Sequence, residues 1–470
     1  MAFTKIISTL GPASYTTDLM KDLIRSGVDI FRINMSHGSY PDALLYLSNI
    51  REASLELEKH IPVFMDLRGP KIRIGVIEGD EVELFEGEEI LITTEKVQGS
   101  AKKISTDYSH IAKQVEIGDT ILLDDGKIVI KVIASGKSDV QCKIISGGML
   151  RSRKGLMLPG KEILLPALSK KDIEDVKFGI ENGIDGFMLS FVQKQENISE
   201  LHDIMQSFGK ILPVISKIES AKGIENLEAI TKISDGILVA RGDLGVELPV
   251  WELPPMQEYI INIAQKDKKP VIVATEMLES MINNNRPTRA EISDVATAVT
   301  EGADAVMLSG ETAIGKYPVQ AVNIMDRTLE QAEKLMKKPT RTIDPQSDHL
   351  LSDSVSFSAV ELSRNLNAKA IVLYSESGFT ARTVAHFAPS VPIYVFTSNI
   401  HTARICSIYR GTETFLLEKK PENFDSFLAE ITTTLLTKEL AKTGDIIVAA
   451  NVTGRNSNSS QANSVKVFIC

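Results

Sequence analysis

Eight apolar segments, each followed by a stretch with helical periodicity, occupy most of the first 340 residues of the chain. The expected strands are 4–10, 29–36, 61–67, 184–191, 211–218, 235–241, 269–275 and 303–309. Strands that alternate with helices form parallel sheets, and eight such units close into a (β/α)8 TIM barrel of the α/β class. This repeat constrains the fold strongly, because the active site of such a barrel lies at the carboxyl ends of its strands.

The alternation is interrupted after the third expected strand. Residues 69–165 contain short β runs separated by Gly and Asp, and Asp125-Gly126 between two apolar runs is a hairpin signal. We expect a small β-barrel domain here, inserted in a βα loop on the face where the barrel binds its ligands. The barrel itself then comprises residues 1–68 and 166–340.

A separate domain is expected after the barrel. Residues 337–348 are charged, contain proline and lack periodicity, as is typical of a linker. Beyond them, residues 350–470 again alternate apolar strands with helical stretches. The pattern predicts an open α/β domain at the C-terminal end.

Composition excludes several classes of function. The formal net charge of −10 argues against a nucleic-acid partner, because phosphate backbones require clustered Lys and Arg. The three cysteines, Cys142, Cys406 and Cys470, form no CxxC pair, which fits a reducing compartment. The N-terminus lacks the apolar region of a signal peptide, and no apolar run is long enough to span a membrane. We therefore expect a soluble cytoplasmic enzyme with no membrane partner.

Charged residues end two neighbouring strands of the expected barrel. Lys217 and Glu219 close the fifth strand, and Arg241 and Asp243 close the sixth. Two carboxylates from adjacent strands are hard oxygen ligands that suit Mg²⁺, and Gly242 lets a ligand approach the backbone. A lysine beside a metal can stabilise a developing oxyanion or a transferring phosphoryl group. The alternative is a pair of structural salt bridges at the strand ends.

The other strand ends add polar groups to the same mouth. They are Arg32, Asn34, Ser36 and His37 at the second strand, Asp66, Arg68, Lys71 and Arg73 at the third, Thr275 and Glu276 at the seventh, and Ser309 to Thr312 at the eighth. Carboxylates for a cation and cationic groups for phosphate indicate metal-assisted transfer on a small, highly anionic substrate. His37 is either a general base or a structural histidine. Residues 310–317 approach a P-loop but lack its final Ser or Thr, so we interpret them as a tight glycine turn.

Nine sequence motifs, in a fixed order, resemble those of a known protein family. They are KIISTLGPAS, RINMSHG, DLRGPKIR, KGLMLPG, SKIES, ARGDLGVE, ATEMLESM, RPTRAEISDVATAV and MLSGETAIGKYP. In this order they resemble pyruvate kinases of the bacterial type, densely over residues 1–340 and loosely beyond. The resemblance implies the last step of glycolysis, in which the phosphoryl group of phosphoenolpyruvate passes to ADP and gives ATP. A Mg²⁺-stabilised enolpyruvate is then protonated to pyruvate.

The resemblance also implies roles for the matching positions. Glu219 and Asp243 are expected to hold Mg²⁺ or Mn²⁺, which bridges the substrate carboxylate, the enolate oxygen and the phosphoryl group. Lys217 is expected to stabilise the enolate and the transferring phosphoryl charge. Arg32 is expected to bind the phosphate of phosphoenolpyruvate.

Further roles follow from the same resemblance. Gly242, Asp243 and Thr275 are expected to meet the substrate carboxylate, and Thr275 with a water and Ser309 is the candidate proton relay to the enolate carbon. Three residues are expected to contact the nucleotide: Arg73, Lys154 and His37. The β insert is expected to act as a lid that closes over the metal–nucleotide complex and excludes water.

One departure from the family concerns a monovalent cation. Potassium-dependent members resemble GPEIR where this chain has GPKIR at 69–73. The cation pocket would consist of Asn34, Ser36, Asp66 and the backbone carbonyl of Leu67. Lys71 would place an ammonium beside this pocket and replace K⁺ electrostatically. We therefore expect activity without added K⁺.

The C-terminal domain carries a candidate effector loop. It consists of Ser375, Glu376, Ser377, Gly378, Phe379 and Thr380, which follow a strand and open a helix as an anion nest would. The loop resembles the one by which many pyruvate kinases bind a sugar-phosphate activator, although Phe379 stands where an Arg is common. Residues 452–464 match the family's other effector loop only loosely. The expected effector is a sugar phosphate or AMP, and the alternative is an ordinary helix cap by Ser377 or Thr380.

Two other functions fit part of this pattern. A metal-dependent barrel lyase acting on a pyruvate enolate needs the same metal pair but no nucleotide lid, so a requirement for ADP separates the two. A non-catalytic, effector-binding relative would not need Lys217, Glu219 and Asp243 together. The resemblance further implies a homotetramer, with Arg289 near a subunit contact.

Overall fold

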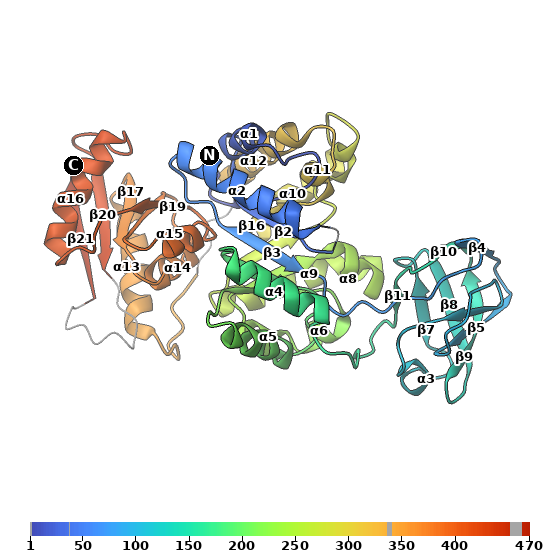
Figure 1. Cartoon of the computed structure of the whole chain (residues 1–470). Coiled ribbons are helices and arrows are strands. Elements are labelled where there is room, and N and C mark those ends of the chain that lie inside the picture. The colour runs from blue at the N-terminus through green and yellow to red at the C-terminus, as the bar shows by residue number, and fades with distance from the viewer. Residues whose placement is uncertain (1, 37, 336–340, 452–462) are drawn as a thin grey trace.

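The computed structural model describes residues 2–36, 38–335, 341–451 and 463–470 (Figure 1). Eight parallel strands close a barrel in the order β1-β16-β15-β14-β13-β12-β3-β2. They are β1 (Lys5–Thr9), β2 (Val28–Asn34), β3 (Val63–Leu67), β12 (Gly186–Leu189), β13 (Val214–Ile218), β14 (Gly236–Ala240), β15 (Val271–Ala274) and β16 (Ala305–Leu308). The closed barrel confirms the fold predicted from the repeat, although each strand is shorter than its apolar segment.

Helices cover the outside of the barrel and link its strands. They are α1 (Thr17–Arg25), α2 (Tyr40–Glu56), α4 (Lys170–Glu181), α5 (Gln195–Ser207), α6 (Ala221–Glu225), α7 (Leu227–Ile233), α8 (Arg241–Glu247), α9 (Leu253–Lys266), α10 (Arg289–Glu301), α11 (Gly310–Ala313) and α12 (Pro318–Leu335), with 3-10 turns η1 (Val250–Glu252) and η2 (Glu279–Ile282). The sequence predicted one helix over 221–232, but it is broken at Asn226, whose side-chain amide donates to the Gln193 carbonyl at 2.7 Å. None of the described helices is both long and apolar enough to cross a membrane.

The interior of the barrel is a packed core. Ile30, Phe64, Met188 and Leu238 fill it and are fully buried. A Cβ at Gly186 would lie 2.3 Å from the Phe64 ring, so glycine makes room for that ring. A second apolar layer lies between the strands and the helices. Because the interior is filled, the chemistry of the barrel is confined to the ends of its strands.

The β insert lies between β3 and α4 in the chain. Its elements are β4 (Glu81–Leu84), β5 (Glu89–Thr93), β6 (Lys103–Ser105), α3 (Ile111–Gln114), β7 (Thr120–Leu123), β8 (Ile128–Ser135), β9 (Asp139–Ser146), β10 (Gly148–Arg151) and β11 (Leu156–Met157). Their hydrogen bonds form a six-stranded mixed sheet, β11-β7-β8-β9-β5-β6, and a two-stranded sheet, β10-β4, around a hydrophobic core of their own. Figure 1 shows the insert on the opposite side of the barrel from the C-terminal domain.

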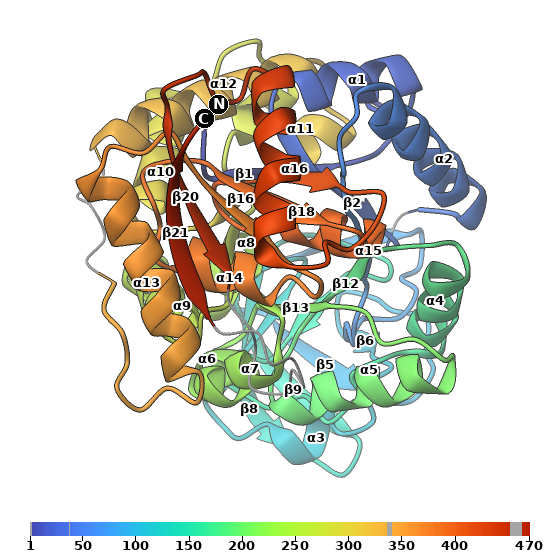
Figure 2. The same ribbon diagram turned by 90° about the vertical axis from the view of Figure 1, so that its left-hand side faces the viewer.

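The C-terminal domain is a five-stranded α/β sheet in the order β19-β18-β17-β20-β21, in which β21 alone is antiparallel. Its elements are α13 (Leu350–Asn365), β17 (Ala370–Tyr374), α14 (Phe379–His386), β18 (Ile393–Thr397), α15 (Ile400–Cys406), β19 (Thr412–Leu416), α16 (Phe424–Thr437), β20 (Ile446–Asn451) and β21 (Ser464–Ile469). Figure 2 views the molecule from this domain, with the barrel behind it. It docks where barrel strands begin: Lys5 of β1 donates to the Thr412 carbonyl at 2.8 Å, and Asp185 just before β12 pairs with Arg404 at 3.4 Å.

Candidate active site

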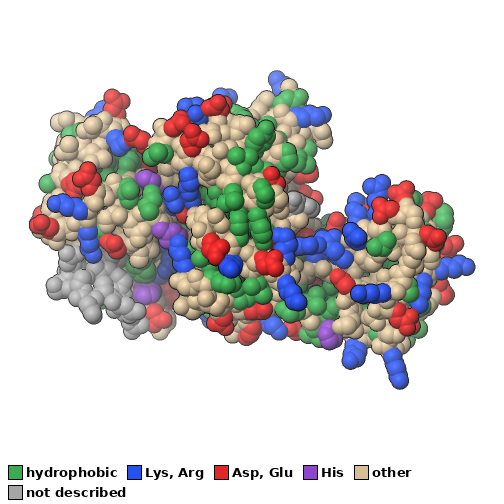
Figure 3. All heavy atoms as spheres, in the orientation of Figure 1, with side chains coloured by type: hydrophobic (Ala, Val, Ile, Leu, Met, Phe, Trp, Pro, Cys, Tyr) green, Lys and Arg blue, Asp and Glu red, His purple; other side chains and the backbone are tan. Residues whose placement is uncertain are grey.

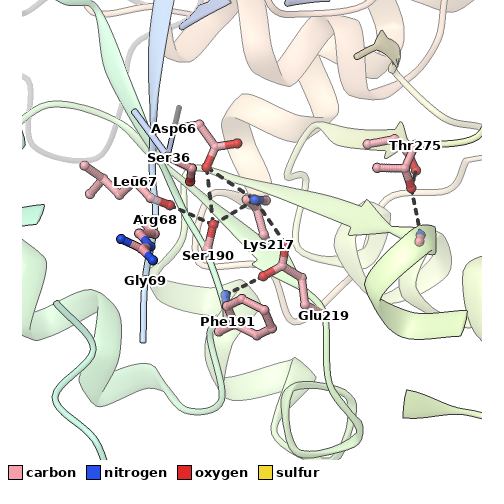
Figure 4. Close-up of polar contacts among 12 residues, drawn as sticks. Ser36, Asp66, Leu67, Arg68, Gly69, Ser190, Phe191, Lys217, Glu219 and Thr275 are labelled. Carbon is pink, nitrogen blue, oxygen red and sulfur yellow. Dashed lines mark hydrogen bonds and ion pairs between the residues drawn. The ribbon is translucent and has the colours of Figure 1, made fainter. Parts of the chain in front are cut away.

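The ammonium of Lys217 is the centre of a buried polar cluster at the carboxyl ends of β3, β12 and β13. Its Nζ lies 2.7 Å from the Ser190 hydroxyl, 3.0 Å from Oε1 of Glu219 and 3.3 Å from Oδ1 of Asp66 (Figure 4). Burial opposes its charge, yet the two carboxylates hold the pKa of Lys217 above its ordinary value. The side chain is therefore a cation fixed in a water-poor site, where its field acts strongly on a developing negative charge.

Arg32 joins this cluster from β2. Its Nε and one terminal nitrogen each lie 2.6 Å from Oδ2 of Asp66, and the other donates to the Thr9 hydroxyl at 2.9 Å. Burial would raise the pKa of Asp66, but Arg32 and Lys217 outweigh it and lower that pKa. Asp66 is thus an ionised anchor that holds two cations side by side in the mouth of the barrel.

Glu219 and Asp243 are the two carboxylates proposed as metal ligands. Oε2 of Glu219 accepts the backbone N–H of Phe191 at 2.7 Å, which the positive φ of Phe191, 53°, directs toward it. Burial, reinforced by the charges of Asp243 and Asp66, raises the pKa of Glu219 to about 7. Burial also raises the pKa of Asp243. The charge of Asp243 thus acts on Glu219, and their joint role as metal ligands stays a prediction.

These carboxylates have the chemistry of a magnesium site. Glu219 is buried and Asp243 is partly buried, both have raised pKa values, and the charge of Asp243 acts on Glu219. A divalent cation stabilises such carboxyl groups in their ionised form. Among the described residues, no group of three or more His, Cys, Asp and Glu side chains could hold a metal. Two protein carboxylates, with the remaining positions left to substrate oxygens and water, match the way Mg²⁺ is held in phosphoryl-transfer sites.

Thr275 lies at the end of β15 in a strained conformation. Its φ is +68°, which is rare for a β-branched residue, and its hydroxyl accepts the backbone N–H of Gly242 at 2.8 Å. The predicted neighbours Gly242 and Thr275 are therefore in contact. Ser309 precedes α11, and its backbone N–H donates to Glu311 at 2.8 Å. No hydrogen bond joins the Ser309 and Thr275 hydroxyls within the part of the chain that the structure describes.

Arg241 contacts the backbone that follows β15, and it has no hydrogen bond to the Lys217 cluster in the described parts of the chain. The sequence placed it at the end of a strand, but it begins α8 and its guanidinium donates to the Thr275 carbonyl at 2.7 and 3.2 Å. It also pairs with Asp294 at 2.5 Å and is only 6% exposed. Arg241 thus holds the strained backbone of Thr275 in place.

The residues of the expected monovalent-cation pocket form some of their hydrogen bonds to one another and others to residues outside the pocket. Oδ1 of Asn34 accepts the backbone N–H of Ser36 at 2.9 Å, and the Leu67 carbonyl accepts the Ser190 hydroxyl at 2.7 Å. Lys71 does not bond to these groups; its Nζ pairs with Asp125 of the insert at 3.1 Å. Its charge nevertheless acts on Asp243 and opposes the rise in the pKa of that carboxyl.

The expected nucleotide-binding residues lie at the base of the insert. Arg73 donates to the Arg153 carbonyl at 2.8 Å, and Lys154 pairs with Asp124 at 2.7 Å. Figure 3 shows Lys and Arg side chains gathered where the insert joins the barrel. Neither residue bonds to the Lys217 cluster in the described parts of the chain, and His37 lies outside the described residues.

A hydrogen bond within the candidate effector loop joins its first residue, Ser375, to Gly378. The Ser375 hydroxyl accepts the backbone N–H of Gly378 at 3.0 Å, and Gly378, with φ +84°, immediately precedes α14. Neither Ser377 nor Thr380 caps the helix, because the residue at the cap position is Gly378 and no side-chain cap bond forms there. Glu376 pairs with Lys420 at 3.8 Å. Residues 452–462, most of the loosely matching second loop, lie outside the described residues.

Three residues of the cluster were not predicted from the sequence. Ser190 and Phe191 end the fourth apolar segment, and Thr9 is the last residue of β1. The same signal, a polar residue at the end of a barrel strand, identifies Ser190 and Thr9. Phe191 contributes only its backbone N–H, so its residue type carries no signal.

A (β/α)8 barrel with a buried lysine, a buried arginine and two carboxylates at its mouth defines a metal-assisted enzyme of anionic substrates. Residues 1–322 match the family model described as pyruvate kinase, barrel domain, and residues 353–468 match pyruvate kinase, alpha/beta domain. The chain belongs to the pyruvate kinase family. It is a glycolytic transferase that moves a phosphoryl group from phosphoenolpyruvate to ADP, and the family uses Mg²⁺.

Individual relatives agree with the family match. A pyruvate kinase of Mycobacterium tuberculosis is 41% identical over 94% of this chain and 93% of its own length. One of Staphylococcus aureus is 38% identical over 95% of this chain and 77% of its own. A crystal structure of a pyruvate kinase from Cryptosporidium parvum superposes with a TM-score of 0.92 at 35% identity, covering 100% of this chain and 96% of the other.

Proposed function

We propose that the Lys217 cluster carries the phosphoryl transfer in this chain. The observation that supports it is the position of one ammonium between Glu219 and Asp66, with Arg32 bonded to the same aspartate. Arg32 binds the phosphate of phosphoenolpyruvate. Lys217 stabilises the charge on the moving phosphoryl group and on the enolate oxygen that it leaves.

Glu219 and Asp243 hold Mg²⁺ or Mn²⁺ in this proposal, and the ion supplies Lewis-acid stabilisation of anionic oxygens. The backbone of Gly242 and the Thr275 hydroxyl, which lie 2.8 Å apart, bind the substrate carboxylate. The bond from phosphorus to the enol oxygen breaks while a bond to a terminal oxygen of ADP forms. The enolpyruvate carbon then takes a proton through a water held by Thr275 and Ser309.

The nucleotide is proposed to bind between barrel and insert. Arg73 and Lys154 are then brought to the Lys217 cluster by closure of the insert, with His37 as a further contact. We propose three domains with the boundaries expected from the sequence: residues 1–68 with 166–340, residues 69–165, and residues 350–470. The separate hydrophobic core of the insert supports its movement as one unit.

Activity without K⁺ is proposed from Lys71. Its charge already acts on Asp243 in this structure, and its pairing with Asp125 connects it to the insert. Closure of the insert would exchange that partner for the pocket of Asn34, Ser36, Asp66 and the Leu67 carbonyl. We also propose a cytoplasmic homotetramer whose candidate effector, a sugar phosphate or AMP, binds at residues 375–380.

A turnover assay tests the assignment. Purified protein with phosphoenolpyruvate, ADP and Mg²⁺ should release pyruvate in step with ATP, and Lys217→Met should abolish both. Release of pyruvate without ADP would instead favour a lyase or phosphatase. Repeating the assay with fructose bisphosphate, hexose monophosphates and AMP tests the effector, which should lower the phosphoenolpyruvate concentration needed for half-saturation.

A further inference from the structure

Two chain segments join the insert to the barrel, one outgoing after β3 and one returning before α4 (Figure 1). In the outgoing segment, the N–H groups of Arg68 and Gly69 donate to Oδ1 of Asp172 in α4, at 2.9 and 3.4 Å. Ile72 already belongs to the insert, because its carbonyl accepts the backbone N–H of Leu156 at 3.0 Å. The outgoing segment therefore passes from barrel to insert just after Gly69.

The returning segment is held to the barrel at Ile163. Oε1 of Gln193 accepts the backbone N–H of Ile163 at 2.8 Å, and Nε2 of the same side chain lies 3.5 Å from the Ile163 carbonyl oxygen. Gln193 is itself fixed, because its N–H donates to Asn197 at 3.0 Å and its carbonyl accepts the Asn226 amide at 2.7 Å. Its side chain is 7% exposed, so water does not readily take its place. The barrel thus holds Ile163 through one buried amide.

The insert holds the residues on either side of Ile163. Nε2 of Gln114 donates to the Glu162 carbonyl at 2.7 Å, and the Tyr108 hydroxyl accepts the N–H of Leu164 at 3.0 Å. When one body turns against another, a short segment bonded to both keeps its bonds only if it lies close to the axis of rotation. Movement of the insert as a unit therefore makes Ile163 a pivot.

Both segments contact one short loop of the barrel, residues 190–193. Gly69, at φ +68°, packs so closely on this loop that a Cβ there would lie 2.9 Å from the carbonyl oxygen of Ser190. At the other end of the loop, Gln193 is bonded to Ile163. The two places where the chain crosses between the domains are therefore fixed to neighbouring residues of one loop.

The loop 190–193 also orients the proposed catalytic groups. The Ser190 hydroxyl lies 2.7 Å from Nζ of Lys217, and the N–H of Phe191 donates to Glu219, also at 2.7 Å (Figure 4). The left-handed backbone of Phe191 is held in place by contacts on both sides of it. One loop thus carries the hinge contacts of the insert and the contacts that orient Lys217 and Glu219.

We propose that Gln193 is a positioning residue that fixes the pivot of the insert to the loop contacting Lys217 and Glu219. This role rests on the proposed function, because it requires an insert that closes over the nucleotide. A fixed pivot brings Arg73 and Lys154 of the insert to a constant position relative to the phosphoryl group at the cluster. Without the amide of Gln193 the insert closes about a less defined axis, so fewer closures align the nucleotide for transfer.

Steady-state kinetics with both substrates varied test this role. Gln193→Met keeps the size of the side chain and removes its amide. We expect kcat to fall and KM for ADP to rise, each at least about fivefold, because only closure over the nucleotide is impaired. The dissociation constant of phosphoenolpyruvate, measured by equilibrium dialysis with Mg²⁺ and without ADP, should stay within about twofold of the wild-type value.

Gln195→Met is the matched control. Gln195 is exposed on α5, and its amide donates to the neighbouring Glu196 at 3.3 Å, so the variant should keep the wild-type constants. Equal constants in Gln193→Met and wild type would overturn the proposal, as would an equal loss in the control. Binding of phosphoenolpyruvate that weakens as much as KM for ADP rises would indicate general damage to the site and would also overturn it.

A second measurement needs no variant and decides the outcome if Gln193→Met does not fold. In the wild type, the N–H of Ile163 should exchange slowly with solvent, both in the free protein and with Mg²⁺, ADP and pyruvate, which fill the site without turnover. Fast exchange at Ile163 in either state would overturn the pivot. If the wild type makes no ATP from phosphoenolpyruvate and ADP, the proposed function fails as well; if it does, only the role of Gln193 is at stake.

Discussion

The hydroxyl of Ser190 lies 2.7 Å from the ammonium of Lys217 and donates to the Leu67 carbonyl, also at 2.7 Å. One side chain thus links the proposed catalytic cation to the backbone of the expected cation pocket. Ser190 is 4% exposed, so water does not readily replace it. It is a positioning residue, because it acts on the substrate through Lys217.

Replacing Ser190 by Ala should lower kcat roughly tenfold with little change in KM for phosphoenolpyruvate, because about 1.4 kcal/mol of preorganisation is lost from the transition state. Steady-state kinetics with both substrates varied give the split. Ser190→Thr keeps the hydroxyl and should recover most of the rate. A parallel loss in both variants, or a change in KM alone, would contradict this role.

Removing one carboxylate of the proposed metal pair should weaken the binding of Mg²⁺ and raise the stability of the metal-free fold. In Glu219→Gln we expect the Mg²⁺ concentration for half-maximal rate to rise at least about tenfold. The folded-state pKa of Glu219, about 7, is above its unfolded value, so ionisation destabilises the metal-free fold as pH rises toward 7. The variant should therefore melt at a higher temperature than metal-free wild type at pH 8.

Glu276→Gln is the matched control for that experiment. Glu276 follows the end of β15 but is exposed, so its loss should change neither the Mg²⁺ requirement nor the Tm appreciably. An unchanged Mg²⁺ requirement in Glu219→Gln would remove this carboxylate from the proposed metal site.

Lys71 should determine the response to K⁺. The wild type is expected to turn over at full rate in buffer free of K⁺ and NH₄⁺. Lys71→Gln deletes the ammonium, and its rate should fall at least about tenfold there and recover when KCl is added. Asp125→Asn removes only the partner of Lys71 in this structure and should remain independent of K⁺. A wild-type rate that itself depends on KCl would refute the proposal.

His386 should make the stability of the chain sensitive to acid. Its pKa is about 3 in the fold and about 6.5 when unfolded, so the unfolded chain binds the extra proton between these values. The stabilisation is present above pH 6.5 and is lost as pH falls toward 3, by at most about 1.4 kcal/mol per pH unit. Between pH 6.5 and 5, Tm should fall less in His386→Gln than in wild type. His202→Gln on α5 is the control, and parallel curves for wild type and His386→Gln would contradict the assignment.

Much of the barrel could be predicted because its determinants are local. The expected strand 235–241 contains β14, and the expected helix 289–301 is α10 residue for residue. Alternation of apolar strands with helices requires a parallel sheet, and the ends of its strands must converge. Lys217 and Glu219 could therefore be placed in the mouth from spacing alone, two residues apart on one strand end.

Other features depended on contacts between distant segments. Asn226 breaks an expected helix because a carbonyl 33 residues away in the chain accepts its amide. Lys71 pairs with Asp125, 54 residues away, rather than with the residues beside the pocket expected from the sequence. Such partners come together only after the chain has folded, so no local pattern signals them.

The order of strands and helices, and the residue types at the strand ends, were determined by the sequence, since periodicity and chain direction dictate them. Tertiary structure alone decided which of these groups touch and what charge each carries. Asp66 is ionised because Arg32 and Lys217 reach it, and the pKa of Glu219 is near 7 because burial and Asp243 act on it together. Electrostatic energy depends on distance and on exclusion of water, and both are properties of the assembled fold.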